Sequence, residues 1–388
     1  MAQIKSPNYH FPDRSGPKEL GTPFKKIVLV QVLPPTISGF ESEDRFEELS
    51  RLVETLDGEV VGHIVQRRPN PHREYYVGPG KADQIGSLCD QTEADTVVID
   101  GQLTPTQISH LEHETGSHIM DRTELILEIF ARRAQTAEAK LQVELAYLNY
   151  FHPRHDQSTQ KRAYRGGVRG FGESALGKKI LATRARADLL RKKIDKMKKQ
   201  TESRLRQRSD QWTVALVGYT NAGKSTLLNA LTGESLYADD RLFATLDTTT
   251  RRVFLKENRV ALFSDTVGFI RRLPHELIAS FHSTLSEALG ADLLLHVADA
   301  SALTLKAQME TVQETLQQLG ADEDRVLIAF NKVDAADPSR IEELKSHYPS
   351  AVFISAWTKA GLGDLRNAVF EYLALKARSS QNFAEAGV

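Results

Sequence analysis

The chain has 388 residues, which is too long for one ordinary domain and sufficient for two or three. Its composition, 40% apolar and 26% charged, excludes wholesale disorder, and apolar runs such as Ile27–Val30 are too short to cross a bilayer. The formal net charge of −1 hides an uneven distribution, because residues 161–208 carry 17 Lys/Arg and 4 Asp/Glu, and such a basic segment indicates contact with a polyanion.

Residues 1–25 are rich in Pro, Gly and charge, which is typical of a flexible tail, and they lack the apolar core of a secretory signal. The single cysteine, Cys89, excludes internal disulfides and cysteine-based metal cages. We therefore expect a cytoplasmic protein.

Residues 26–121 alternate short apolar strands with helices, which predicts a small and mainly parallel α/β domain. The expected strands are Ile27–Val32, Glu59–Val65 and Thr96–Asp100, and the expected helices are Glu43–Leu56, Lys81–Cys89 and Pro105–Glu114.

Residues 122–210 predict a long antiparallel helical hairpin. The first helix runs from Arg122 to about Phe151, and Pro153 is expected to end it. A glycine-rich basic loop, Arg165–Gly172, separates it from a second helix over Glu173–Arg208.

Residues 211–377 return to an α/β pattern, followed by a flexible tail over 378–388. The apolar segments of this block predict strands at Val214–Val217, Val260–Ser264, Leu293–Ala298, Val326–Phe330 and Val352–Ile354. The fold class is therefore α/β, with a mostly parallel sheet that has helices on both faces.

A phosphate-binding loop follows the first of these strands and opens a helix. It reads Gly218-Tyr219-Thr220-Asn221-Ala222-Gly223-Lys224-Ser225, the G-x-x-x-x-G-K-[ST] pattern in its strand–turn–helix setting. Backbone N–H groups of such a loop face the phosphates at a helix N-terminus. Lys224 is expected to reach the β- and γ-phosphates, and Ser225 to hold Mg²⁺ through its hydroxyl.

A second motif, Asp265-Thr266-Val267-Gly268, follows the strand Val260–Ser264. Its carboxylate is expected to orient a water bound to Mg²⁺, and the N–H of Gly268 is expected to face the γ-phosphate.

Two further motifs predict a guanine site. Asn331-Lys332-Val333-Asp334 supplies a carboxylate that can accept two hydrogen bonds from guanine N1 and N2, a donor pair that adenine lacks. Ser355-Ala356-Trp357 ends the next strand, where backbone N–H groups could meet guanine O6.

The switch segment is expected between the phosphate loop and Asp265, in the stretch Phe243-Ala244-Thr245-Leu246-Asp247. Thr245 is the candidate whose hydroxyl binds Mg²⁺ when the γ-phosphate is present, and Thr248, Thr249 and Thr250 compete with it by chemistry. In this order and spacing the motifs resemble the GTPase domain of the P-loop class, with GTP and GDP as ligands and with catalytic roles for Lys224, Thr245 and Gly268.

Three residues bear on hydrolysis. Phe269 stands where many GTPases place a glutamine that orients the attacking water, so we expect slow intrinsic hydrolysis that a partner accelerates. Asn221 could help to hold K⁺ beside the phosphates, as asparagine does in related GTPases. His275 could rescue hydrolysis but is better explained as a surface residue.

The chain resembles the HflX family of GTPases in five segments, and the N-terminal ones among them are absent from general GTPases. These segments are Tyr76–Lys81, Arg132–Thr136, Lys140–Leu145, Phe243–Asp247 and Leu262–Ser301, and the resemblance covers about residues 27–375. It implies a GTPase that binds the large ribosomal subunit, reaches ribosomal RNA with its N-terminal domain and long helices, and dissociates stalled or idle ribosomes.

The sequence departs from the family pattern at three points. Gly170–Gly177 reads GFGESALG where the family typically has GPGETQLE, and Thr248 replaces the usual proline. We also expect no further domain after the last GTPase helix, whereas many members have one. The departure at Gly170–Gly177 bears on whether the protein splits ribosomes, and it leaves the GTP-binding motifs unchanged.

The basic segment indicates RNA independently of the family. Arg162, Arg165 and Arg169, interleaved with Tyr164 and Phe171, suit phosphate contacts and base stacking. The alternative is a regulatory GTPase switch that acts on a protein effector or an anionic membrane surface. We expect a monomer when free and no stable membrane insertion.

Two weaker patterns remain in the N-terminal domain. Tyr76–Lys81 could be a second phosphate-binding turn, although a simple turn between strand and helix explains it better, and the family resemblance links this domain to ATP. His110, His113 and His118 show no clean metal-binding pattern.

Overall fold

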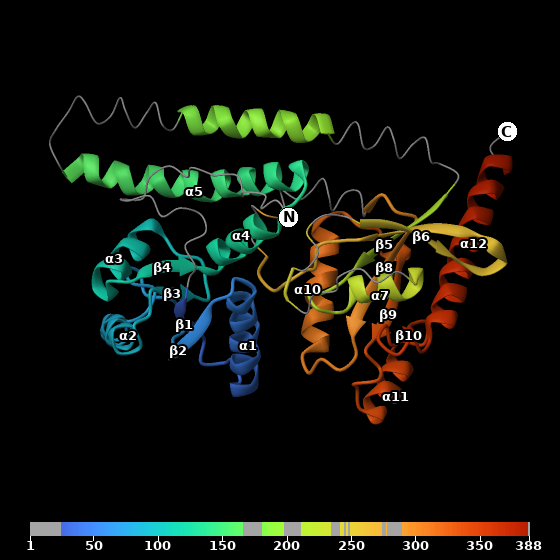
Figure 1. Cartoon of the computed structure of the whole chain (residues 1–388), viewed down its shortest axis with the longest axis horizontal. Helices are drawn as coiled ribbons and strands as arrows, with labels where there is room; N and C mark the ends of the chain where they lie inside the picture. The colour runs from blue at the N-terminus through green and yellow to red at the C-terminus, as the bar shows by residue number, and fades with distance from the viewer. Residues whose placement is uncertain are drawn as a thin grey trace, which may run out of the picture. The chain divides into compact units, whose positions relative to one another are not determined.

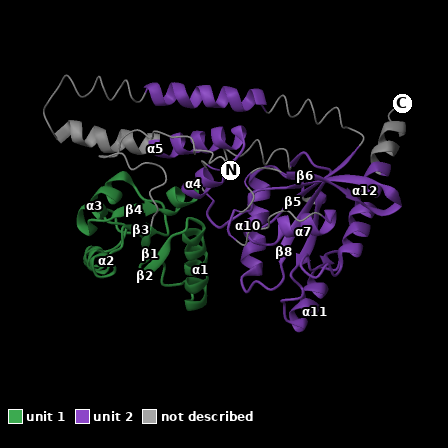
Figure 2. Ribbon diagram, in the orientation of Figure 1, with its two compact units in different colours: residues 1–126 green, residues 127–388 purple. Residues whose placement is uncertain are grey.

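The computed structural model describes residues 25–165, 181–197, 211–233, 241–243, 246, 249–273, 277 and 289–386. The chain forms two compact units, residues 1–126 and 127–388 (Figure 2). The boundary lies within helix α4 (Arg122–Arg133), five residues beyond the predicted end of the N-terminal domain.

Unit 1 is a four-stranded parallel sheet with the strand order β2-β1-β3-β4. Its strands are β1 (Lys26–Leu33), β2 (Glu59–Arg67), β3 (Thr96–Ile99) and β4 (His118–Asp121). The connecting helices are α1 (Gly39–Thr55), α2 (Pro79–Thr92) and α3 (Pro105–Thr115) (Figure 1). The three predicted strands and three predicted helices are confirmed. The sequence did not reveal β4, because only two of its four residues, Ile119 and Met120, are apolar.

Local chemistry places the helix starts of unit 1. Thr104 and Gln107 form a capping box around the start of α3, and Pro105 occupies the first helical position, where its missing N–H is tolerated. The Ser38 hydroxyl accepts the Glu41 N–H at the start of α1.

The predicted first helix of the hairpin is two helices. α4 ends at Arg133 and α5 spans Ala137–Arg165, with the Thr136 hydroxyl accepting the Ala139 N–H at the new start. The expectation that Pro153 ends the helix was wrong, because α5 continues twelve residues past it. Proline fixes φ near −65°, which a helix accepts, so its cost is one lost hydrogen bond and a local clash that the flanking turns can offset.

The hairpin itself is confirmed in its described part. α5 lies beside a helix over residues 181–197 that runs in the opposite direction (Figure 1). Their apolar stripes pack together through Leu141, Leu145, Leu148, Ala187, Leu190 and Ile194. Arg186 adds a two-pronged ion pair with Glu144, at 2.7 and 3.0 Å. The glycine-rich loop and both ends of the second predicted helix lie outside the described residues.

The remainder of unit 2 is a six-stranded sheet with the order β10-β9-β8-β5-β7-β6. The strands are β5 (Trp212–Val217), β6 (Thr249–Phe254), β7 (Val260–Asp265), β8 (Leu293–Asp299), β9 (Val326–Asn331) and β10 (Val352–Phe353). The five predicted strands are confirmed and pair in parallel, and the sequence missed β6, an antiparallel edge strand whose outward residues give it little apolar signal.

Helices cover both faces of this sheet, as predicted. α7 (Lys224–Thr232) and α12 (Leu362–Ala386) pack on the face that carries Val214, Leu295 and Val297. α10 (Leu305–Gln318) and α11 (Pro338–His347) pack on the other face. Short 3₁₀ turns, η1 (Lys256–Asn258) and η2 (Glu323–Arg325), precede β7 and β9. α12 continues to Ala386, beyond residue 377 where a tail was expected.

Candidate functional site

The predicted phosphate loop connects the end of β5 to the start of α7, and its glycines are sterically required. A Cβ on Gly218 would lie 2.2 Å from the carbonyl oxygen of Val297. Gly223 has φ +89°, and a Cβ there would lie 2.4 Å from Nδ2 of Asn331. The loop can therefore pass close to β8 and β9 only because these two positions lack side chains.

Lys224 is buried within this loop. Its Nζ donates hydrogen bonds to the carbonyl oxygens of Gly218 and Tyr219, at 3.1 and 2.9 Å, so the ammonium group is held over the start of the loop. Burial lowers the pKa of Lys224 to about 8, although the nearby Asp265 raises it. Because its hydrogen-bond partners among the described residues are uncharged carbonyl groups, this buried ammonium is well suited to receive an anion.

Ser225 and Asp265 come together at the ends of α7 and β7. The Ser225 hydroxyl donates to Oδ2 of Asp265 at 2.6 Å, and Asp265 is 2% exposed. A hydroxyl and a carboxylate are the hard oxygen donors that Mg²⁺ prefers, so these residues fit the ion predicted from the sequence.

The segment after Asp265 is fastened to the phosphate loop by backbone hydrogen bonds. The Thr220 N–H donates to the Phe269 carbonyl at 2.7 Å, and the Phe269 N–H donates to the Gly218 carbonyl at 3.0 Å. The Tyr219 hydroxyl accepts the Arg271 N–H at 3.0 Å. The Phe269 side chain is 1% exposed, so at this position an apolar ring is buried where many GTPases place a glutamine.

Asn331 joins the phosphate loop to the predicted guanine loops. Its Nδ2 donates to the Ala222 carbonyl and its Oδ1 accepts the Ala356 N–H, both at 2.9 Å. Asp334 is exposed, and Trp357 is 82% exposed. Asn331, Ala222 and Ala356 thus bring three of the predicted motifs together at one end of the sheet.

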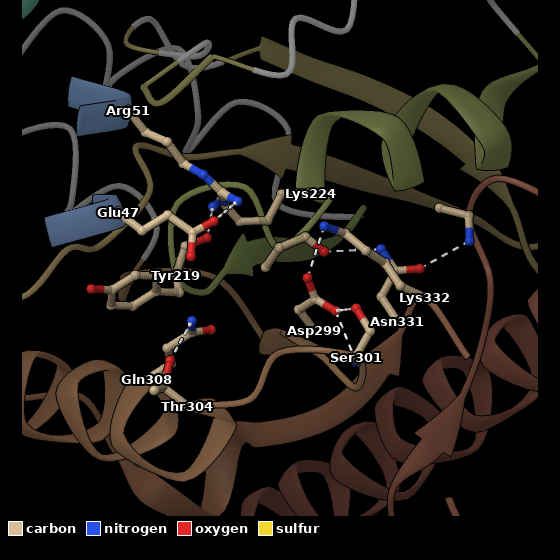
Figure 3. Close-up of polar contacts among 12 residues, drawn as sticks. Glu47, Arg51, Tyr219, Lys224, Asp299, Ser301, Thr304, Gln308, Asn331 and Lys332 are labelled. Carbon is tan, nitrogen blue, oxygen red and sulfur yellow. Dashed lines mark hydrogen bonds and ion pairs between the residues drawn. The ribbon is translucent and has the colours of Figure 1, made fainter. Parts of the chain in front are cut away.

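Asp299 belongs to the same site and was not singled out from the sequence. Figure 3 shows its carboxylate between Lys332 and Ser301. Oδ2 lies 2.8 Å from Nζ of Lys332, and Oδ1 accepts the N–H and hydroxyl of Ser301. Its place at the end of β8, level with Asn331 in the parallel register, is the signal that could have revealed it.

The switch segment is described only in part. Leu242, Phe243 and Leu246 are buried, and the Phe243 ring packs edge-on against Phe130 of α4, with 4.7 Å between ring centroids. Thr245 lies outside the described residues, as do Ala244, Asp247 and Thr248. The competitors Thr249 and Thr250 are paired with β7 as the first residues of β6.

His296 is a buried histidine of β8 close to the site. Burial, assisted by the charge of Lys224, lowers its pKa to about 4, so the ring is neutral near pH 7. No sequence motif marked it, because a single histidine inside an apolar strand carries no pattern.

Other candidate sites gain no support. Among the described residues, no group of three His, Cys, Asp or Glu side chains is arranged to hold a metal ion, and none of the helices has the length and apolar character needed to span a bilayer. At the Tyr76–Lys81 turn, the Gly78 N–H is used by Oε1 of Gln66 at 2.9 Å and Nζ of Lys81 by Gln84. A second phosphate site at this turn stays a prediction.

Family models match three consecutive parts of the chain. A model described as GTP-binding GTPase N-terminal matches residues 43–131, and one described as GTP-binding GTPase Middle Region matches residues 133–208. A model described as 50S ribosome-binding GTPase matches residues 213–332, which contain the phosphate loop and Asn331.

Whole-chain relatives agree with these matches. The chain is 40% identical over 357 residues to the GTPase HflX of Caldanaerobacter subterraneus subsp. tengcongensis, with 91% of this chain and 81% of that relative covered. It is 40% identical over 334 residues to the GTPase HflX of Escherichia coli (strain K12), with 84% and 78% covered.

A solved structure agrees as well. The crystal structure of SsGBP in complex with GDP has a TM-score of 0.51 and 27% identity, and covers 90% of this chain and 99% of that chain. The resemblance found in the sequence and the P-loop GTPase fold are thereby confirmed. The chain belongs to the HflX family and is a GTPase.

Proposed function

We propose that this GTPase associates with the large ribosomal subunit when GTP is bound, contacts ribosomal RNA and dissociates stalled or idle ribosomes. The observation that carries the proposal is the match of residues 213–332 to a model described as 50S ribosome-binding GTPase, on a chain that also contains a basic hairpin. Ribosomal RNA is the polyanion that such a hairpin would meet.

The hairpin offers cations for that contact. On the helix over residues 181–197, Arg186 and Arg191 are engaged by Glu144 and Asp188, at 2.7 and 2.8 Å. Four exposed cations form no ion pair with described residues, namely Arg184, Lys192, Lys193 and Lys196. They are available to phosphate groups, and the apolar seam with α5 keeps them on the outer side.

The nucleotide site is proposed to work as follows. Backbone N–H groups of the phosphate loop and the ammonium of Lys224 bind the phosphates, and the Gly268 N–H binds the γ-phosphate. Asp334 accepts hydrogen bonds from guanine N1 and N2, while Asn331 holds the loops around Ala222 and Ala356 in position. Asp299 restrains Lys332, whose stem can then lie along the base.

Ser225, Thr245 and Asp265 are the proposed Mg²⁺ ligands, the last through water. When bound, the ion neutralises charge on the β- and γ-phosphates. Asn221, which has φ +58°, is the proposed contact for K⁺. Because Phe269 is buried and apolar, intrinsic hydrolysis is slow, and the ribosome is the partner that accelerates it.

Sedimentation through a sucrose gradient tests the proposal. The protein is mixed with ribosomes in a non-hydrolysable GTP analogue, in GDP or without nucleotide. We expect it to travel with large subunits in the analogue and to be released in GDP. Equal association in all three conditions would contradict the proposal.

Lys224→Ala should abolish the nucleotide dependence in the same experiment, and its melting temperature without nucleotide checks that it is folded. Flotation with anionic liposomes in the presence of competing RNA distinguishes ribosome association from the alternative, a regulatory switch at an anionic membrane surface. Liposome binding that survives RNA competition would favour a membrane-directed switch.

A further inference from the structure

The segment Gly268–Arg271, here called the strap, is attached to the phosphate loop by three hydrogen bonds. Two of them join backbone to backbone and use the carbonyl and the N–H of Phe269, at 2.7 and 3.0 Å. The third depends on a side chain, because the Tyr219 hydroxyl accepts the Arg271 N–H at 3.0 Å. Any residues could form the first two bonds, whereas the third requires a side chain that carries an acceptor at this reach.

The Tyr219 hydroxyl fixes the far end of the strap. The next residue along the chain, Arg272, has φ +51°, a left-handed conformation that is uncommon for a residue with a side chain. Such a conformation persists where the surrounding structure holds the backbone in place. Tyr219 is itself 6% exposed, so packing restrains its ring. The strap is therefore anchored at Arg271, directly before the chain turns.

The near end of the strap lies beside the ammonium of Lys224. A Cβ placed on Gly268 would lie 3.1 Å from Nζ of Lys224 and 2.9 Å from Cα of Thr220. Gly268 is thus next to the group that the proposed function assigns to the phosphates. The γ-phosphate is present in GTP and absent from GDP, so a contact that the strap makes with it favours GTP over GDP.

We propose that Tyr219 acts through its hydroxyl as a positioning residue by which the site distinguishes GTP from GDP. By holding Arg271 it keeps the strap on the phosphate loop, and Gly268 is then in place for the γ-phosphate before the nucleotide binds. This inference rests on the proposed contact between the Gly268 N–H and the γ-phosphate.

The two nucleotides should respond differently to loss of this anchor. Without the Tyr219 hydroxyl, the strap lies on the phosphate loop in a smaller fraction of the molecules. The apparent affinity for a nucleotide that needs the strap falls by that fraction. GDP has no γ-phosphate and makes no use of the Gly268 N–H, so its affinity should not change. A merely structural role of the hydroxyl would affect both nucleotides alike.

Tyr219→Phe tests the assignment in the full-length chain, because it removes the hydroxyl and keeps the ring. We expect it to bind a fluorescent, non-hydrolysable GTP analogue about threefold to tenfold more weakly, the effect of one hydrogen bond. Its affinity for the matching fluorescent GDP should equal that of the wild type. Hydrogen exchange without nucleotide should accelerate over residues 269–272, which shows directly that the strap has loosened.

Tyr372→Phe is the control, because it also removes a hydrogen-bonded tyrosine hydroxyl from unit 2. The Tyr372 hydroxyl donates to the carbonyl of Asp324 in η2, before β9 and therefore at the opposite end of the parallel strands from the phosphate loop. Tyr372→Phe should leave both affinities unchanged. The assignment is overturned if Tyr219→Phe leaves the ratio of the two affinities at the wild-type value, whether neither affinity falls or both fall together.

Gly268→Ala separates this inference from the proposed function on which it rests. Its Cβ would crowd Nζ of Lys224, so it should weaken binding of the GTP analogue at least as much as Tyr219→Phe does. If Gly268→Ala has this effect and Tyr219→Phe has none, only the role of Tyr219 is refuted. If Gly268→Ala has no effect either, the proposed γ-phosphate contact is refuted as well. These measurements use no ribosomes, so neither result bears on ribosome association.

Discussion

At the scale of single residues, the proposed recognition of the base depends on one exposed carboxylate, Asp334. Replacing it by asparagine exchanges an acceptor for a donor, which suits the 2-carbonyl of xanthine and not the 2-amino group of guanine. We expect Asp334→Asn to weaken GDP binding at least about 100-fold, equivalent to roughly 3 kcal/mol. The variant protein should bind xanthosine diphosphate more tightly than GDP. Calorimetry with both diphosphates measures this, and an unchanged preference would refute the proposed guanine site.

The buried His296 gives a prediction about pH. Its pKa is about 4 in the folded protein and about 6.5 when unfolded, so between these values the unfolded chain binds the extra proton. The stability that neutral His296 contributes is complete above pH 6.5 and is lost as pH falls towards 4. Between pH 7 and 5 the loss should be about 2 kcal/mol, measured by urea unfolding.

His296→Leu should abolish this part of the pH dependence, whatever its stability at pH 7. His347→Gln is the control, because His347 is exposed on α11. If His296→Leu keeps the full wild-type loss between pH 7 and 5, another group is responsible.

The sequence predicted those site residues that form local motifs with fixed spacing, such as Lys224, Ser225 and Asn331. It did not predict Asp299, His296 or the contact of Phe243 with Phe130. Each of these depends on strand register or on packing between residues far apart in the chain. Phe130 and Phe243, for example, are 113 positions apart. The spacing of residues along a sequence does not indicate which distant residues will pair.

At the scale of elements, the hairpin depends on a narrow apolar seam. Leu190 is fully buried between α5 and the helix over residues 181–197, so Leu190→Ala should cost about 2–5 kcal/mol. The cost should fall on the hairpin: hydrogen exchange there should accelerate, while GDP affinity stays within about twofold. Its neighbour Leu189, which is 45% exposed, provides the control, since Leu189→Ala should change neither the hydrogen exchange of the hairpin nor the GDP affinity.

Elements were predicted well where burial leaves a clear pattern. The apolar runs of β1, β5 and β8 gave their positions to within one or two residues. β6 and the break at Thr136 escaped, because an edge strand with polar residues and a short interruption between two helices barely change the periodicity. The prediction that Pro153 ends the helix was wrong, because the helical preference of the residues on both sides outweighed the tendency of proline to break a helix.

At the scale of the whole molecule, charge is concentrated on the hairpin and should set the salt dependence of ribosome association. Association in the GTP analogue should weaken steeply between about 50 and 200 mM salt. Lys192→Ala with Lys193→Ala should reduce the slope of log affinity against log salt by about two, because each lysine would neutralise one phosphate of the RNA.

Lys345→Ala is the comparison for that experiment, because Lys345 is an exposed lysine of α11 already paired with Glu342 at 2.8 Å. It should leave the slope unchanged. An unaltered slope in the double variant would move the RNA-binding surface away from this helix face.

The edge-on pair of Phe243 and Phe130 has a practical consequence for dissecting the enzyme. A fragment cut to begin at residue 211 would retain every nucleotide motif and yet lose the ring on which Phe243 rests. The loop that leads to Thr245 would then carry a bare aromatic side chain in water. Turnover measured on such a truncated protein would describe a differently supported loop, and kinetic comparisons should use chains that keep α4.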